Sequence, residues 1–227
     1  MPSDDLIRTL AVPGILFDFD GPVCDVFAGA PAPEVARKLE ELLVAQAPSL
    51  ISETATTDDP LVIMRIAYGV DQELGQRIEQ ALTEAEEIAV AVAGNPTPGA
   101  VAALRDAKSL GRRVAVVSNN SASCVRAFLD RHGLMEYVEE IIGRPAGRPD
   151  LMKPQPYSLL KAAEVLGVEP AKCTLIGDSL TDIEAAHAAG ATAIGYANKP
   201  HKRSTFAEAG ADAIVDSMAE IPEALRQ

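Results

Sequence analysis

Residues 14–21 read Gly-Ile-Leu-Phe-Asp-Phe-Asp-Gly, and this stretch decides how the chain folds. A short apolar run that begins at a glycine is typical of a strand buried on both faces, so we predict a strand over residues 14–19. Asp18 and Asp20 stand at its carboxyl end. Open parallel sheets bind ligands beyond this edge, and residues two apart in an extended chain project to the same side. Both carboxylates can then serve one site, although two turn-forming aspartates before a glycine give the same pattern.

A helical segment follows this strand, from about residue 31 to residue 93. Leucines recur at helical spacing within residues 33–47, opposite a charged face, which favours an amphipathic helix. Two more helices are predicted at residues 60–68 and 71–93. A Gly-Asn-Pro sequence at residues 94–96 then breaks the helical pattern.

Strands and helices alternate over the rest of the chain. The predicted strands are residues 113–117, 138–142, 173–176, 192–196 and 213–215, and the predicted helices are residues 97–110, 123–132, 155–166, 181–189 and, as the last helix, 204–209. Strands separated by helices pair in parallel through right-handed crossovers, with helices on both faces of the sheet. The predicted fold is therefore α/β, a doubly wound, Rossmann-like parallel sheet core with an inserted all-helical cap domain. We place the core at residues 1–25 and 95–227 and the helical cap at residues 26–94.

The overall charge excludes some partners. The chain has 33 acidic and 20 basic residues among 227, a net charge of −13. Nucleic acids and anionic membranes bind basic surfaces, so neither is an expected partner. Asp4 and Asp5 precede any apolar stretch, unlike the basic start of a signal peptide, and no apolar run approaches the roughly 18 residues that cross a bilayer. We expect a cytoplasmic protein, and the sequence predicts no oligomeric state.

The three cysteines, Cys24, Cys124 and Cys173, show no spacing typical of disulfides or of metal ligands. Apolar neighbours indicate that Cys124 and Cys173 are buried thiols of a reducing compartment. Cys24 lies near the first aspartates, so a reactive thiol there stays open as an alternative to a buried one.

Two further signals lie near predicted strand and helix ends. Ser118 follows the apolar run 114–117 and precedes Asn119, so a strand-to-helix turn there would direct a hydroxyl and free amide groups at an anion. Helix N-capping explains the same residues and is their more common use. Lys153 precedes Pro154, which favours an extended backbone before a helix. Its ammonium group could offset the charge of a phosphoryl group, although a single lysine is usually solvated.

The fourth signal is Gly-Asp-Ser-Leu-Thr-Asp at residues 177–182, after another apolar run. Two carboxylates four residues apart at a strand-to-helix turn suit a hard cation, which prefers oxygen ligands. Capping of the helix start explains the same acidic residues. Asp178, at the end of the strand, is the better candidate for a metal ligand. Asp182, in the first helical turn, is expected to act behind the metal ligands or as a cap.

The order of these four signals, with a helical insertion after the first strand, resembles the haloacid dehalogenase superfamily over essentially the whole chain. The resemblance implies Asp18 as nucleophile and Asp20 as general acid and base. The phosphate-binding residues that it implies are Ser118, Asn119 and Lys153. It also implies a Mg²⁺ cofactor, held by Asp18, the backbone carbonyl of Asp20, and Asp178, with Asp182 behind them.

One position departs from the family pattern. Relatives usually have threonine or valine where this chain has Pro22, which lacks an amide donor. We therefore expect the hydrogen bond that a threonine would give Asp20 to be absent. The substrate should be set by cap residues that face the crevice. Arg65 and Tyr68 are candidates, although placement on the surface is the more common use of such residues.

The implied function is that of a Mg²⁺-dependent phosphatase that hydrolyses a small phosphorylated metabolite, a phosphate monoester, through an aspartyl-phosphate intermediate. A phosphosugar mutase with the same residues is the main alternative, and a catalytically silent binding protein of the same fold is a further one. True dehalogenases and phosphonate-cleaving relatives typically lack the second aspartate, so Asp20 and Asp178 favour a phosphate ester. A signalling receiver module gathers similar groups, but it is about half this length and has no helical insertion.

Overall fold

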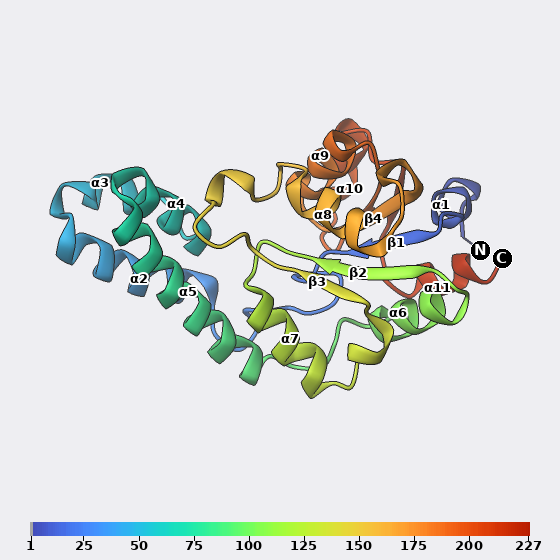
Figure 1. Ribbon diagram of the computed structural model, residues 1–227, viewed down its shortest axis with the longest axis horizontal. Helices are drawn as coiled ribbons and strands as arrows, with labels where there is room; N and C mark the ends of the chain where they lie inside the picture. Colours follow the sequence, from blue (N-terminus) through green and yellow to red (C-terminus); the bar gives the residue numbers. More distant parts are fainter. Residues whose placement is uncertain (1) are drawn as a thin grey trace.

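The computed structural model describes residues 2–227, which form one six-stranded sheet with helices around it (Figure 1). All neighbouring strands are parallel, and their order across the sheet is β3-β2-β1-β4-β5-β6. The strands are β1 (Gly14–Phe17), β2 (Arg113–Val117), β3 (Glu140–Ile142), β4 (Cys173–Gly177), β5 (Thr192–Tyr196) and β6 (Ala213–Val215). The doubly wound α/β fold predicted from the sequence is confirmed.

β1 lies in the middle of the sheet, and its two neighbours come later in the chain. β2 pairs with it on one side and β4 on the other, and Phe17 is level with both Val116 and Ile176. The residues that follow these three strands therefore leave the sheet side by side at one edge. This is the topological switch point, where doubly wound sheets bind ligands.

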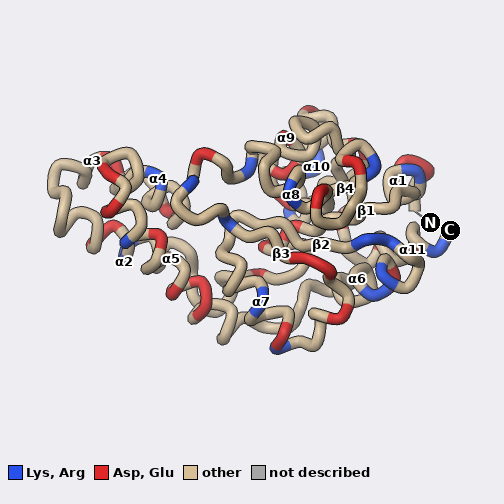
Figure 2. Tube along the Cα trace, viewed as in Figure 1, with Lys and Arg blue, Asp and Glu red and all other residues tan. Residues whose placement is uncertain are grey.

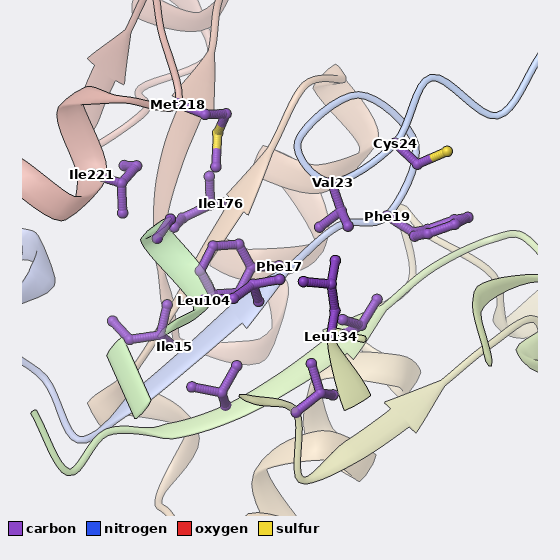
Figure 3. Packing of buried hydrophobic residues seen from close by; sticks show 14 of the residues in the cluster. Ile15, Phe17, Phe19, Val23, Cys24, Leu104, Leu134, Ile176, Met218 and Ile221 are labelled. Atoms are coloured by element: carbon purple, nitrogen blue, oxygen red, sulfur yellow. The ribbon is translucent and has the colours of Figure 1, made fainter. Parts of the chain in front are cut away.

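Helices cover both faces of the sheet (Figure 1). On one face lie α1 (Asp4–Leu10), α6 (Ala100–Ser109), α7 (Ala122–Arg131) and α11 (Glu220–Leu225), and on the other lie α8 (Tyr157–Leu166), α9 (Leu180–Ala189) and α10 (Lys202–Glu208). The side chains of β1 alternate between these layers. Ile15 and Phe17 join the first buried cluster with Leu104 and Ile176 (Figure 3), and Leu16 joins the second. β1 is thus buried on both faces, as its apolar run predicts.

Four helices follow β1 and stand at one end of the sheet (Figure 1). These cap helices are α2 (Ala32–Gln46), α3 (Ile51–Thr54), α4 (Pro60–Val70) and α5 (Gln72–Val92). They bury an apolar cluster that includes Leu39, Ile63 and Leu82, and Met152 from the core joins it. α5 also reaches the sheet layers, because Ala89 and Val90 pack into the first cluster near α7.

Some helices of the structure are not predicted from the sequence. The helix predicted at residues 204–209 is present as α10, but it is not the last one. α11 follows β6, and its six residues are too few for a clear helical pattern. α1, capped by the Ser3 hydroxyl, is also missed. Short 3₁₀ turns complete the elements: η1 (Pro48–Leu50), η2 (Met135–Tyr137), η3 (Pro149–Leu151) and η4 (Pro170–Lys172). None of the helices within residues 2–227 combines the length and the apolar character that a bilayer span requires.

Candidate active site

The carboxyl edge of the sheet and the cap helices enclose a cavity of about 620 Å³. The predicted site residues that line it are Asp18, Asp20, Ser118, Asn119, Lys153 and Asp178. They follow β1, β2 and β4 or precede α8, and the parallel register brings these segments together. Asp182 does not line the cavity and is fully buried.

Lys153 connects Asp18, at the end of β1, with Asp182, in the first turn of α9. Its ammonium group donates hydrogen bonds to Asp18 Oδ1 at 2.7 Å and to Asp182 Oδ1 at 2.5 Å. Only 2% of Lys153 is exposed, so these contacts are shielded from water. Burial raises the pKa of Asp18 well above its usual range, and Asp182 adds to this increase while Lys153 opposes it. Burial alone would lower the pKa of Lys153, but the two carboxylates raise it, so the lysine stays charged.

Asp182 holds the turn that carries Asp178. Its Oδ2 accepts the backbone N–H groups of Asp178 at 3.1 Å and Ser179 at 3.0 Å, together with the Ser179 hydroxyl at 2.7 Å. Gly177 is required here, because a Cβ atom on it would lie 2.4 Å from the Asp182 side chain. Donors therefore occupy both carboxylate oxygens of Asp182, which caps α9 and pairs with Lys153.

Asp178 has two partners that the sequence analysis misses. Lys202 donates to its carboxylate at 2.7 Å and to its backbone carbonyl at 2.6 Å, and Asn198 donates to the carboxylate at 2.9 Å. Both lie in the segment after β5, so a search beyond every predicted strand would have found them. Gly21 also lies against Asp178, because a Cβ atom on it would be 2.4 Å from the Asp178 carboxylate carbon. The loop that carries Asp20 therefore contacts the turn that carries Asp178.

The loop around Asp20 replaces the donor that Pro22 lacks. The backbone N–H of Val26 donates to Asp20 Oδ1 at 3.0 Å. The carbonyl of Phe19 accepts the N–H groups of Val23 and Cys24, so the turn forms without an N–H at residue 22. A threonine hydroxyl is absent, as expected, but the Asp20 carboxylate is still held by a hydrogen bond.

The backbone after β2 forms a turn before α7 begins. The N–H of Asn120 donates to Ser118 Oγ at 3.1 Å, and the Ser118 hydroxyl donates to Asn120 Oδ1 at 3.2 Å. α7 is capped by Ser121 instead, so Ser118 is not used as the helix cap. Asn119 and Lys153 exchange two bonds: the Lys153 N–H donates to Asn119 Oδ1 at 3.0 Å, and the Asn119 amide donates to the Lys153 carbonyl at 3.2 Å. This exchange fixes the two backbone segments beside each other.

A buried ion pair ties α5 to the same turn. Nη1 of Arg144, which follows β3, lies 2.8 Å from Oε1 of Glu86 on α5, and both side chains are almost inaccessible to solvent. Glu86 also accepts the Ser121 N–H at 2.9 Å and the Asn120 amide at 3.2 Å, and Arg144 donates to the Asn119 carbonyl at 3.0 Å. The pair is not among the residues predicted from the sequence. Glu86 falls at the spacing of the apolar stripe of α5, however, and a charged residue at such a position indicates a buried partner. Through these bonds the ion pair holds the turn between β2 and α7 in place.

Carboxylate oxygens gather where a divalent cation fits. Single side-chain oxygens of Asp18, Asp178 and Asp182 lie within 4.8 Å of one another. Within residues 2–227, Asp18 Oδ2 and Asp178 Oδ1 accept no hydrogen bond, whereas both oxygens of Asp182 do. Free carboxylate oxygens are the hard ligands that Mg²⁺ prefers. Asp18 and Asp178 are therefore the side chains best suited to a metal ion here.

The three cysteines are buried and free. Burial raises the pKa of Cys24 and of Cys124 above the usual range and raises the pKa of Cys173 to about 11. Thiols that resist ionisation are poor nucleophiles. Cys24 is therefore a packing residue, and the alternative of a reactive thiol is not supported.

Comparison with known proteins places this chain in a family. A family model for haloacid dehalogenase-like hydrolases matches residues 12–190. The phosphoglycolate phosphatase of Neisseria meningitidis is 32% identical over 193 residues, which cover 81% of this chain and 80% of the relative. The phosphoglycolate phosphatase of Nitrosococcus oceani is 32% identical over 70% of this chain and 72% of the relative.

Solved structures share the fold. CbbY from Rhodobacter sphaeroides, in complex with phosphate, has a TM-score of 0.68 and 24% identity over 95% of this chain and 100% of that chain. A hydrolase from Pseudomonas syringae has a TM-score of 0.67 and 19% identity over 94% of this chain and 97% of that chain. At these identities the likeness concerns the fold and not the substrate.

Proposed function

The chain belongs to the haloacid dehalogenase-like hydrolases and is a phosphate monoester hydrolase, and we propose that its nucleophile is Asp18. Asp18 attacks phosphorus in line, the bond from phosphorus to the alcohol oxygen breaks, and an aspartyl-phosphate forms. Asp20 protonates the departing alcohol oxygen. Asp20 then takes a proton from a water molecule, which attacks the aspartyl-phosphate, releases inorganic phosphate and regenerates Asp18.

The contact between Lys153 and Asp18 carries this proposal. Lys153 occupies one oxygen of the carboxylate, and the other oxygen has no hydrogen-bond partner within residues 2–227. Asp18 lines the cavity, so a substrate can reach its carboxylate. Asp20 lines the same cavity two residues further along, which suits a group that passes a proton to the leaving oxygen.

Mg²⁺ is the proposed cofactor, and Asp18, Asp178 and the backbone carbonyl of Asp20 would hold it. When bound, the ion supplies positive charge that offsets the charge on the transferred phosphoryl oxygens. The proposed phosphate-binding residues are Ser118, Asn119 and Lys153. Asp182 would orient Lys153 and the turn behind the metal ligands.

The proposed division into domains has residues 1–25 and 95–227 as the core and residues 26–94 as the cap. The cap helices support it, because most residues of their buried cluster lie within residues 26–94, although Met152 of the core also joins that cluster. Because residues of both parts line the cavity, movement of the cap would open the site to substrate and then exclude bulk water.

The experiment that tests this function is hydrolysis of 4-nitrophenyl phosphate with and without Mg²⁺. We expect wild type to be active with Mg²⁺ and Asp18→Asn to lose nearly all activity. Asp4→Asn is the control, because Asp4 is an exposed carboxylate on α1, outside the cavity lining. Equal rates for wild type and Asp18→Asn would contradict the assignment of the nucleophile.

A further inference from the structure

The cavity has two unlike walls. The sheet edge supplies the groups proposed to act on the phosphoryl group, whereas the side that faces the alcohol part of a substrate comes from the cap helices. We call Thr56, Thr57, Asp58 and Asp59, the residues just before α4, the cap wall. The apolar residues Phe27, Leu61 and Leu82 flank it.

The cap wall is acidic. Of the described residues that line the cavity, only Lys153 is a cation, and its ammonium group is already bonded to Asp18 and Asp182. The cap wall itself contributes two carboxylates. Acidic residues also outnumber basic ones along the cap helices as a whole (Figure 2). Asp58 and Asp59 are exposed, so water screens part of their charge. An anionic group on the substrate would still meet two carboxylates here, and the described cavity lining has no free cation to pair with it.

The start of α4 does not compensate for this charge. A helix N-terminus usually attracts anions through its free N–H groups. Here Pro60 has no N–H, and the N–H of Leu61 donates to the Asp59 side chain at 2.8 Å. The N–H groups of Val62 and Ile63 donate to the Asp59 carbonyl at 3.1 and 3.3 Å. The first turn therefore offers no free donor to a ligand.

Within residues 26–94 no cation lines the cavity, and three nearby arginines bond to other groups. Lys38 of α2 and Arg77 of α5 are exposed. Arg65 of α4 is exposed, donates to the Lys153 carbonyl at 3.5 Å and does not line the cavity. Arg37 of α2 pairs with Glu41. Arg144 forms the buried pair with Glu86. Arg65 and Tyr68, the candidates from the sequence, thus lie outside the cavity lining, and Tyr68 donates to Glu79.

We infer that the alcohol part of the substrate carries no anionic group and is a neutral polyol or an amino alcohol. This inference rests on the proposed function. Hydroxyl or ammonium groups can donate hydrogen bonds to the carboxylates of the cap wall. Thr57 can donate to a substrate oxygen, because its hydroxyl oxygen accepts the Asp59 N–H at 3.1 Å and its proton stays available. The cavity thus disfavours phosphoglycolate, whose alcohol part bears a carboxylate, although relatives of this chain are phosphoglycolate phosphatases.

The test compares kcat/KM of the Mg²⁺-loaded full chain for glycerol 3-phosphate, phosphoethanolamine and phosphoglycolate, with 4-nitrophenyl phosphate as the reference ester. We expect phosphoglycolate to be at least about tenfold poorer than either of the other two, which is the size of a modest like-charge penalty. In the double variant Asp58→Asn with Asp59→Asn, kcat/KM for phosphoglycolate divided by kcat/KM for glycerol 3-phosphate should rise by about fivefold or more. Asparagine at residue 59 keeps an oxygen that can cap α4.

Glu53→Gln is the matched control, because it removes an exposed charge from α3, outside the cavity lining, and should leave the ratio unchanged. Preference for phosphoglycolate by an enzyme that also cleaves 4-nitrophenyl phosphate would overturn this inference and leave the proposed function standing. An unchanged ratio in the double variant would also overturn it. If the enzyme hydrolysed none of the four esters, the proposed function would be overturned, and this inference with it.

Discussion

Replacing Asp20 by asparagine should stabilise the metal-free protein at alkaline pH, although it removes a group that the proposed chemistry needs. Burial raises the pKa of Asp20 to about 6; the Val26 N–H opposes this increase, and the Asp178 and Asp25 carboxylates add to it. The folded protein therefore binds the Asp20 proton more tightly than the unfolded chain does. Asparagine keeps the oxygen that accepts the Val26 N–H but carries no charge.

The sign of the effect follows from proton binding. Below pH of about 4 both states hold the proton, and between about 4 and 6 only the folded state keeps it. The stability of the wild type should therefore fall as pH rises through 6. The pKa of Asp20 is about 6 in the folded protein and about 3.9 in the unfolded chain. This difference corresponds to a loss of at most about 3 kcal/mol of folding stability, an upper bound because the side chain is partly exposed.

Urea unfolding in a chelator measures this effect. At pH 8, Asp20→Asn should raise the free energy of unfolding by up to about 3 kcal/mol, and the gain at pH 4 should shrink to about 0.5 kcal/mol. Asp25→Asn, on the exposed part of the loop, should change it by less than about 0.5 kcal/mol. A gain that is equal at both pH values, or a loss at pH 8, would refute the reasoning.

Glu86→Gln should lower the free energy of unfolding in urea by about 3–5 kcal/mol, because Arg144 loses its main buried counterion. Glu86→Leu with Arg144→Met removes both charges but should recover only part of this loss, because the Ser121 N–H and the Asn120 amide still lose their acceptor. No recovery at all would argue against the ion pair. Gly177→Ala should lower the free energy of unfolding by about 1–3 kcal/mol, because the new Cβ atom meets a buried side chain. Gly69→Ala, with open space on α4, should leave stability unchanged or raise it slightly. Equal effects of the two variants in thermal unfolding would contradict this. Asp20→Asn should slow hydrolysis of an alkyl phosphate far more than that of 4-nitrophenyl phosphate, whose leaving group needs no proton; equal losses would contradict its role as an acid.

The sheet edge could be predicted because local patterns determine it. An apolar run before Asp18 and another before Asp178 fix two strand ends, and the alternation of strands and helices makes these strands parallel. Their meeting at one edge then follows from the fold, and the contact between Gly21 and Asp178 agrees with it. Lys153 could be named from the order of the signals alone.

Other parts of the site depend on contacts between segments that carry no local pattern. Lys202 reaches Asp178 only because β5 lies beside β4, and the sequence does not show which loop folds back. Glu86 and Arg144 meet across the cap and the sheet edge, 58 residues apart in sequence. Pro22 predicts the loss of a threonine hydroxyl, but not the backbone donor that replaces it. Such partners are set by tertiary packing, which a single sequence does not display.

The most direct test of the account is mass spectrometry of the enzyme, quenched in acid within its first turnover of 4-nitrophenyl phosphate with Mg²⁺. We expect one added phosphoryl group on the peptide that contains Asp18, and none in Asp18→Asn treated in the same way. A phosphoryl group on a different residue, or hydrolysis at full rate by Asp18→Asn, would contradict it.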